Sequence, residues 1–246
     1  MPAAIGLIVL LMSLLPATLM AQTSSTDESR PRRGIVRVET RSLVDDEGPM
    51  LGLGASYFTA LHRCRHDRER LESDLEFLAG CGFNYYRMLS MVGWYESWEG
   101  KEIAPVGFTN RGGKKVAPWP DYWDQFGELI DIAYDRYGMR TQVTSFAAAQ
   151  RMPSMEARQD HVEQFLTKIL PGREHKLMLI EVANEAWQNG FEGEQGVADL
   201  RSLARLLNER TEVPVAITSN HHDSFDALYR QSGVDLATWH FSRDRR

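Results

Sequence analysis

The amino-acid sequence predicts an α/β fold, an incomplete (β/α)8 TIM barrel with about six of its eight strands and a short β-hairpin ahead of the first strand. Strand and helix patterns alternate from Leu51 onward, no glycine-rich phosphate loop follows a strand, and polar residues gather where strands end. The alternation implies parallel pairing, because each crossover helix returns the chain to the same edge of the sheet. The missing phosphate loop disfavours a nucleotide-binding doubly wound sheet and favours the barrel.

The composition fits one domain of this kind. The chain has 246 residues, of which 43% are hydrophobic and 25% charged, and a single α/β barrel typically needs about 250 residues. The formal net charge is -6, and no stripe of Lys and Arg accompanies it. Because nucleic-acid binding depends on clustered cations, we expect no nucleic-acid partner. The composition leaves the oligomeric state open.

The first 21 residues differ from the rest of the chain. Ile5–Leu15 is an apolar run with the length of a signal-peptide core, too short to cross a membrane as a helix. A membrane anchor and a disordered apolar tail are the competing interpretations. We expect a secreted or periplasmic protein with no stable membrane span after signal cleavage. The predicted organisation is a signal peptide over residues 1–21, a flexible linker over 22–34 and the partial barrel over 35–246.

A hairpin and six strands are predicted in order along the chain. Ile35–Val38 and the acidic, glycine-closed stretch Leu43–Gly48 form the hairpin. Apolar residues at helical spacing predict helices between the strands, the first of them capped by Asp67 and the second by Asp121. The predicted barrel strands are Leu51–Tyr57, Phe83–Leu89, Arg140–Ser145, Leu177–Ala183, Val215–Thr218 and Leu236–Phe241.

The fourth predicted strand ends at a residue that could act as a catalytic acid. Its apolar run is followed by Asn184 and Glu185, and then by the aromatic Trp187. In parallel barrels the functional residues lie at the carboxyl ends of the strands. A carboxyl group held there, half out of water and near apolar rings, has a raised pKa, and a shift of about two units corresponds to about 2.7 kcal/mol. Such an acid stays protonated near neutral pH and can donate to a leaving group. The plainer interpretation is an exposed loop Glu.

Several segments together resemble a known enzyme family. Gly82–Arg87 and Ala183–Glu185 are similar to strands two and four of the clan A retaining glycoside hydrolases, particularly the cellulase-like family 5. The hairpin Leu43–Gly48 and the segment Leu53–Ser56 resemble the opening of such barrels. The similarity extends over Ile35–Ser242, and it is the ordered set of segments that makes it specific.

The resemblance implies roles for four residues and no cofactor. Glu185 stands at the position of the acid/base, and Asn184 at that of the amide that binds the sugar hydroxyl beside the scissile bond. Arg87 matches the arginine that orients and tunes the catalytic carboxylates, and His240 matches a histidine of the same cleft. Family members often carry Tyr where this chain has Ser242. Their nucleophile is a Glu ending strand seven, so we expect it, and two further βα units, beyond Arg246.

Strand parity places a second acid inside the barrel. Glu181 shares the face of the fourth strand with Leu179 and Ala183, while Ile180 and Val182 face the helices. A buried charge needs a partner, and Arg87 lies on another even-numbered strand, so it can reach the same layer of the barrel. Arg87 is therefore expected to be an ion-pair residue, a catalytic tuner or both.

Further residues are candidates for binding the carbohydrate. Trp94 and Trp187 are expected to stack on sugar rings, because an aromatic side chain offers roughly 150–250 Å² of flat surface. Tyr57, at the end of the first strand, and His222, after the fifth, are candidate substrate contacts. The aromatic residues could equally pack beneath the loops.

The predicted function is retaining hydrolysis of a β-linked polysaccharide or oligosaccharide. A metal-dependent TIM-barrel hydrolase is one alternative, since the stretch 220–223 (Asn-His-His-Asp) could bind a metal together with His240. We expect no metal, because no His-x-His pair follows the first strand and ligand motifs are weak alone; the plainer interpretation is that Asp223 caps a short helix. Two further interpretations are a non-catalytic carbohydrate-binding barrel and a truncated product that does not fold alone. With strands one and six as unpaired edges, the isolated chain is expected to be poorly soluble and inactive.

Overall fold

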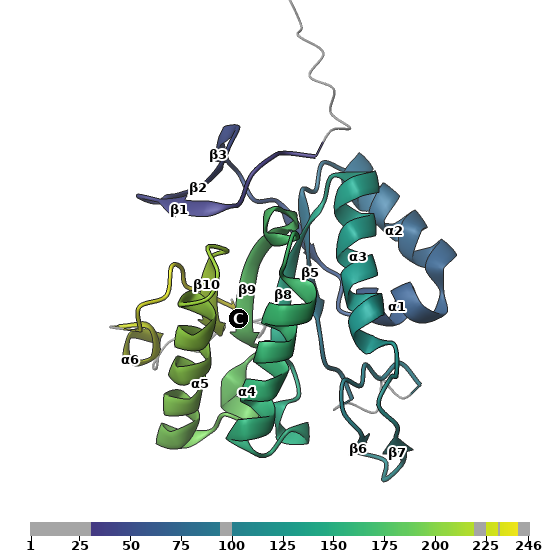
Figure 1. Ribbon diagram of the computed structural model, residues 1–246, viewed down its shortest axis with the longest axis vertical. Helices are drawn as coiled ribbons and strands as arrows, with labels where there is room; N and C mark the ends of the chain where they lie inside the picture. Colours follow the sequence, from purple (N-terminus) through teal and green to yellow (C-terminus); the bar gives the residue numbers. More distant parts are fainter. Residues whose placement is uncertain (1–30, 94–99, 219–224, 231, 241–246) are drawn as a thin grey trace, which may run out of the picture.

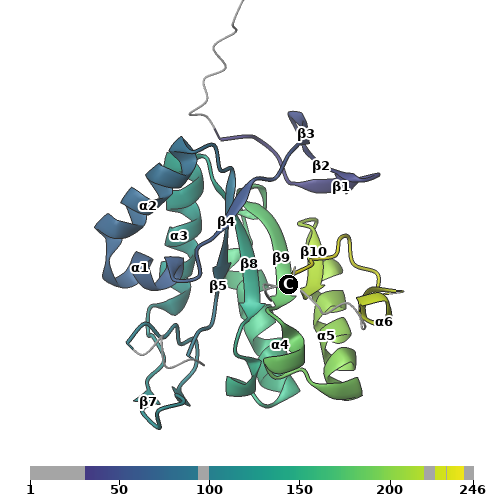
Figure 2. The ribbon, with the colours of Figure 1, turned by 180° about the vertical axis from the view of Figure 1, so that it is seen from behind.

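The computed structural model describes residues 31–93, 100–218, 225–230 and 232–240. Its centre is a parallel sheet of five strands in the order β10-β9-β8-β5-β4. Figures 1 and 2 show this sheet from its two sides, with the large helices packed along one of them. The strands are β4 (Gly54–Ser56), β5 (Tyr85–Leu89), β8 (Arg140–Phe146), β9 (Leu177–Ala183) and β10 (Val215–Thr218).

The spatial order of these strands is also their order along the chain. In a doubly wound sheet the order reverses at a switch point, and helices cover both faces. Here each crossover moves one strand further in the same direction, so the sheet winds in one sense and curves as the wall of a barrel does. The predicted incomplete (β/α)8 barrel is confirmed, with five parallel strands among the described residues.

The crossover helices follow the predicted apolar spacing. In α3 the buried residues Phe126, Leu129, Ile130 and Ala133 face the sheet, and Gly138 ends the helix with φ 65°, a left-handed conformation that suits glycine. The Asp67 side chain caps α2 by accepting from Arg70 N. The helices are α1 (Ala60–His66), α2 (Arg68–Gly80), α3 (Tyr122–Tyr137), α4 (Met155–Gln164) with its π-helical extension Phe165–Ile169, α5 (Gly193–Asn208) and α6 (Phe225–Tyr229).

Alternate residues of β9 serve two different cores. Ile180 and Val182 are fully buried in the large cluster between the sheet and the helices. Leu179 lies instead in a smaller cluster with Val36 and Ala216, next to the N-terminal hairpin. Glu181, between Ile180 and Val182, is fully buried on the sheet's other face. The alternation that strand parity predicts holds for residues 179–182, whereas Met178 lies in the smaller cluster and Ala183 in the large one.

Three antiparallel strands cover the amino-terminal end of the sheet (Figure 1). They are β1 (Arg37–Glu39), β2 (Ser42–Asp45) and β3 (Gly48–Met50), so the predicted hairpin is present and carries one more strand. Their anchor is Asp45, whose buried carboxylate accepts from Arg32 at 2.7 Å and from Arg140 at 2.8 Å. Arg140 also donates to the carbonyls of Arg32 and Gly34. The last residues of the expected linker are thus bound to the base of the barrel.

The expected sixth strand is wrong within the described residues. Residues 236–240 hold a single β-bridge residue, Trp239, and no strand, and residue 241 lies outside the described part. One edge of the described sheet is the expected first strand, β4, and the other is the fifth, β10, in place of the sixth. The prediction also missed α1 and a two-stranded hairpin, β6 (Phe108–Thr109) and β7 (Lys115–Val116), within the long loop. The expected signal peptide lies outside the described residues and stays a prediction.

No helix within the described ranges is both long enough and apolar enough to span a membrane.

The Asp45 anchor predicts how stability depends on pH. Burial raises the pKa of this carboxyl group, but the bonds from Arg32 and Arg140 outweigh burial and lower the pKa to about 2. Because the folded pKa lies below the unfolded value, the ionised carboxylate stabilises the fold above about pH 4. This contribution is lost as the pH falls from about 4 to about 2. At neutral pH it amounts to about 2–3 kcal/mol.

We therefore expect Asp45→Asn to lower the free energy of unfolding at pH 7 by about 2–3 kcal/mol, with a smaller loss at pH 3. Urea denaturation at the two pH values measures both. Asp46→Asn is the matched control, because the Asp46 side chain is 59% exposed and lies 3.7 Å from Arg37. An equal loss for the two variants would contradict the anchoring role of Asp45.

Candidate active site

The candidate site begins where β9 turns away from the sheet. Asn184 N still continues the ladder by donating to Phe146 O at 2.9 Å. The next residue, Glu185, has φ 41° and ψ 56°, a left-handed conformation that non-glycine residues adopt at a cost of about 1–3 kcal/mol. The chain then enters the 3₁₀ turn Ala186–Gln188. This reversal projects the Glu185 side chain from the carboxyl end of the strand.

Neighbouring groups hold the reversed backbone in place. Asn189, which is 1% exposed, donates its side-chain amide to the carbonyls of Asn184 at 2.9 Å and of Glu185 at 3.3 Å. Ala186 N donates to the Thr218 hydroxyl at 3.2 Å, at the end of β10. Strained backbone persists where the surroundings fix it from several sides, and such places concentrate at functional sites.

The side chains of His240 and Gln188 both contact the Glu185 carboxylate. His240 Nδ1 lies 3.2 Å from Glu185 Oε1. Gln188 Nε2 donates to Glu185 Oε2 at 2.5 Å. The side chains of Glu185 and His240 are 24% and 34% exposed, so this pair is half-buried and still reachable from solvent.

Beneath this pair lies a buried ionic network. Arg87 on β5 donates to Glu181 Oε2 from Nε at 3.1 Å and from Nη2 at 2.5 Å. Two hydroxyl groups also donate to this carboxylate, Thr144 at 2.8 Å and Thr238 at 2.6 Å. Glu181 is fully buried, so every one of these bonds replaces water that the charge has lost. The ion pair that strand parity predicts is confirmed.

Arg87 links this buried network to the exposed end of β9. Its Nη2 also donates to Asn184 Oδ1 at 3.1 Å. Because the amide oxygen of Asn184 accepts this bond, its amide nitrogen points away from Arg87 and presents a hydrogen-bond donor there. Arg87 thereby fixes the orientation of the residue directly before Glu185.

The structure thus brings four of the predicted residues together: Arg87, Asn184, Glu185 and His240. The roles that the resemblance implies for them remain predictions. Trp187 lies just beyond Glu185 in the 3₁₀ turn and is 42% exposed, as a stacking surface requires. Trp94 and His222 lie outside the described residues.

Tyr57 does not join this group. Its hydroxyl donates to Asp74 Oδ2 at 2.7 Å, and Asp74 belongs to α2, so the phenol points into the helical layer. β4 ends at Ser56, and the next residue but one, Phe58, lies with its ring 5.5 Å from Arg87 Cζ. The strand ends one residue earlier than predicted, and it is Phe58 rather than Tyr57 whose side chain lies beside Arg87.

Sequence reasoning also missed Gln188, Asn189, Thr144 and Thr238. Alternation along β8 could have placed Thr144 in the interior, since it pairs in register with Glu181. The other three act from a turn and from an irregular segment, where no periodicity indicates side-chain direction.

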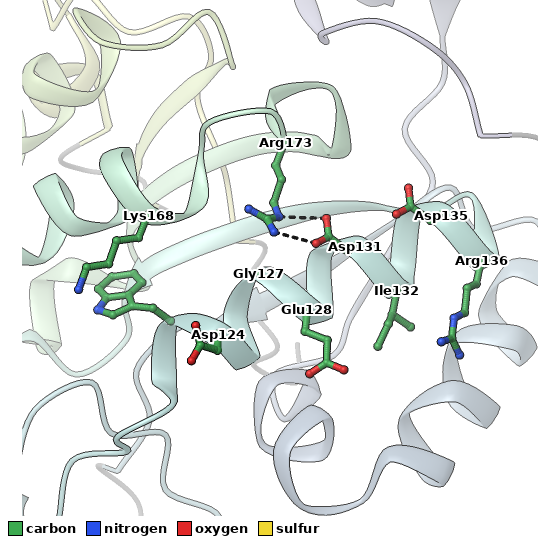
Figure 3. Close-up of a pocket in the computed structure, with 10 residues that line it drawn as sticks. Asp124, Gly127, Glu128, Asp131, Ile132, Asp135, Arg136, Lys168 and Arg173 are labelled. Carbon is green, nitrogen blue, oxygen red and sulfur yellow. Dashed lines mark hydrogen bonds and ion pairs between the residues drawn. The ribbon is translucent and has the colours of Figure 1, made fainter.

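A hollow beside α3 lies away from these residues. A cavity of about 470 Å³ runs along α3, lined among others by Asp131, Lys168 and Arg173. Figure 3 shows that charged groups in its lining pair with each other, as in the two bonds from Arg173 to Asp131 at 2.9 and 2.8 Å. None of the predicted site residues lines this hollow. Because charged groups of its lining already pair with each other, we do not assign it a role in the candidate site.

No group of three or more potential metal ligands exists within the described ranges. The histidines of the 220–223 stretch, on which the metal alternative depends, lie outside those ranges.

No protein-family model and no curated protein sequence matches this chain. Solved structures do match it. A glycoside hydrolase family 5 protein from Bacteroides vulgatus aligns over 82% of this chain with a TM-score of 0.55 and 15% identity. A family 5 mannosidase from Rhizomucor miehei, in complex with mannosyl-fructose, aligns over 85% with a TM-score of 0.60 and 16% identity.

An endo-1,4-beta-mannanase from Rhizomucor miehei aligns over 85% of this chain with a TM-score of 0.63 and 11% identity. The chain spans 43%, 62% and 72% of the lengths of these three proteins. At such identities the matches establish the fold, which is the barrel of the family 5 glycoside hydrolases. The resemblance drawn from the sequence is confirmed at that level.

The buried ion pair between Arg87 and Glu181 predicts that removing one partner lowers the free energy of unfolding, and that removing the charge of the other partner restores most of it. Arg87→Met leaves the Glu181 carboxylate in the sheet interior without its cation, and removing one partner of a buried pair costs about 3–5 kcal/mol. In Arg87→Met/Glu181→Gln the charge is absent, while the amide oxygen can accept from one threonine and the amide nitrogen can donate to the hydroxyl of the other. We expect the double variant to recover most of the loss in urea denaturation. A double variant no more stable than Arg87→Met would show that the charge is not the cause.

The left-handed conformation of Glu185 predicts an unusual preference for glycine. Glu185→Gly and Glu185→Ala both remove the carboxylate, but glycine adopts φ 41° without the strain of a Cβ atom. We expect the glycine variant to unfold with a free energy about 1 kcal/mol higher than the alanine variant, measured by urea denaturation. At Glu192, with φ -75°, the same two substitutions should show no advantage for glycine. The same order at both positions would refute the strain.

Proposed function

We propose that this protein is a glycoside hydrolase that cleaves a β-linked polysaccharide or oligosaccharide with retention of configuration. The observation that carries the proposal is the half-buried Glu185 carboxylate at the carboxyl end of a barrel strand, 3.2 Å from His240 and directly after an Asn184 that Arg87 holds. Functional groups of this barrel type lie at that end of the strands.

Glu185 is the proposed general acid and base. In the first step it protonates the departing glycosidic oxygen, and in the second it removes a proton from the attacking water. The imidazole of His240, at hydrogen-bond distance from Glu185 Oε1, orients the carboxyl group toward that oxygen. Asn184 is proposed to bind the hydroxyl group of the sugar beside the scissile bond, with its amide orientation set by Arg87.

The nucleophile is proposed to be a carboxylate encoded beyond Arg246. A retaining pair needs its two carboxyl groups about 5–5.5 Å apart. Glu181 does not meet this role, since it is fully buried and accepts four hydrogen bonds from Arg87, Thr144 and Thr238. The chain spans 43% and 62% of the length of two family 5 structures that it matches, which supports further barrel strands in the complete protein.

Mannosides are the substrate class that the comparisons support first. Two of the similar structures are described as a mannosidase and an endo-1,4-beta-mannanase. A partly exposed Trp187 beyond the carboxylate offers a flat apolar surface for a pyranose ring. We therefore propose a mannan or a related β-linked glycan as the first substrate to assay.

A carbohydrate-binding barrel without catalysis is the second candidate. The feature that favours it is Ser242, at a position where members of the resembled family often carry Tyr. Coding sequence downstream of Arg246 discriminates the two candidates. A strand ending in Glu supports the enzyme, and its absence from the complete gene supports the binding protein.

The acid role of Glu185 predicts a dependence on the leaving group. In the full-length protein, Glu185→Gln should lower kcat/KM about 10²–10⁴-fold on glycosides with poor leaving groups, the range that general acid catalysis contributes. Activated aryl glycosides need little protonation, so their first step should slow much less. Steady-state kinetics on the two substrate types measures this.

Glu194→Gln is the control, because Glu194 is exposed on α5 and carries the same change of group. Wild-type turnover of poor substrates by the Glu185 variant would exclude the residue as the acid.

A further inference from the structure

The His240 contact with Glu185 raises a structural question. His240 ends the segment of residues 232–240, which holds one β-bridge residue, Trp239, and no strand within the described residues. A paired strand would fix the position of such a side chain through its backbone ladder. Side-chain bonds to this segment therefore contribute to placing His240 at the end of β9.

The phenol of Tyr229, on α6, lies between β10 and this segment. Its oxygen accepts from Thr218 N at 3.1 Å and from Thr238 N at 3.2 Å, and its hydroxyl donates to Thr218 O. Thr218 is the last residue of β10. One hydroxyl group thus bonds the backbone N–H and C=O of Thr218 and the backbone N–H of Thr238. It therefore connects the end of β10 to the segment of residues 232–240.

Helix α6 is itself tied to the barrel. Arg201 on α5 donates to Leu228 O at 3.3 Å and to Arg230 O at 3.1 Å, on either side of Tyr229. In both views α6 lies beyond the β10 edge, next to α5 (Figures 1 and 2). Tyr229 is therefore a fixed point on a short helix.

The start of the segment has its own attachment. Asp235 N donates to Val215 O at 3.2 Å, and Val215 N donates to the Asp235 carboxylate at 2.9 Å. The segment is thus bound to β10 at its beginning by Asp235 and at its middle by the Tyr229 hydroxyl.

Two side chains of the segment then reach the two acids of β9. The Thr238 hydroxyl donates to Glu181 Oε1 at 2.6 Å, and His240 Nδ1 lies 3.2 Å from Glu185 Oε1. Because Thr238 N is the group bonded to Tyr229, loss of the phenol oxygen removes one of the bonds that hold the segment two residues before His240.

We propose that Tyr229 is a positioning residue for the Glu185–His240 pair. Its hydroxyl bonds the end of β10 to Thr238 and thereby sets the place of the His240 imidazole. The positioning is a property of the fold, and its consequence for turnover rests on the function proposed above.

The test removes one oxygen atom. Tyr229→Phe keeps the ring and deletes the hydroxyl, while Tyr137→Phe deletes a phenol that donates to Glu72 at 3.2 Å on another helix. The full-length protein is labelled with ¹⁵N-histidine, and the His240 ring-nitrogen shifts are assigned by comparison with His240→Gln. Glu185→Gln gives the shifts of a His240 that has lost its carboxylate partner.

In Tyr229→Phe we expect the His240 ring shifts to move most of the way to those of Glu185→Gln, and in Tyr137→Phe to stay at wild-type values. Wild-type shifts in Tyr229→Phe would overturn the proposal. With the substrate that the full-length enzyme turns over, Tyr229→Phe should lower kcat at least tenfold with KM changed less than threefold. A variant with displaced shifts and full kcat would overturn the catalytic consequence.

The outcomes separate this proposal from the proposed function. If Glu185→Gln retains turnover, the glycosidase proposal fails, but the ring shifts still report whether Tyr229 places His240. If Tyr229→Phe does not fold, hydrogen exchange of the wild-type protein decides. The Thr238 amide, bonded to the phenol oxygen, should exchange at least tenfold more slowly than an unprotected amide, and unprotected exchange there would overturn the proposal.

Discussion

The buried ion pair between Arg87 and Glu181 is the interaction on which the rest of the site depends. It joins β5 to β9 across β8, and it lies on the face of the sheet that the helices do not cover. A charge at that depth is tolerated because the guanidinium and two threonine hydroxyls together satisfy the carboxylate. The same guanidinium then reaches Asn184. The geometry at the exposed end of β9 is thus determined by a contact made one layer below.

A second constraint is the backbone reversal at Glu185. The strand supplies its last ladder bond at Asn184 N, and the chain then turns through a conformation that favours glycine. Asn189 and Thr218 stabilise that turn. An acidic side chain at this position therefore costs stability, which is compensated by surrounding hydrogen bonds. Such a balance is typical of residues whose side chain is needed where the backbone places it.

Local patterns in the sequence were sufficient for the strands, the helices and the burial of Glu181, because periodicity of two and of 3.6 residues survives without knowledge of distant contacts. They were insufficient where one side chain decides the outcome. Leu236–Phe241 has the composition of a strand, yet the Tyr229 hydroxyl bonds the edge of β10 at Thr218. Asp45 and Arg140 are 95 positions apart, so neither residue carries a local sign of their contact.

Conversely, the grouping of Glu185 with His240 was accessible from the family resemblance, although the expected strand beneath His240 is absent from the described residues. The two facts are compatible because the site requires only that the His240 imidazole lie beside Glu185. A backbone ladder between strands is one of several interactions that can hold it there. A phenol oxygen, which both donates and accepts, can bond three backbone groups at once. The Tyr229 hydroxyl can therefore connect β10 to residues 232–240, where the described residues form no strand.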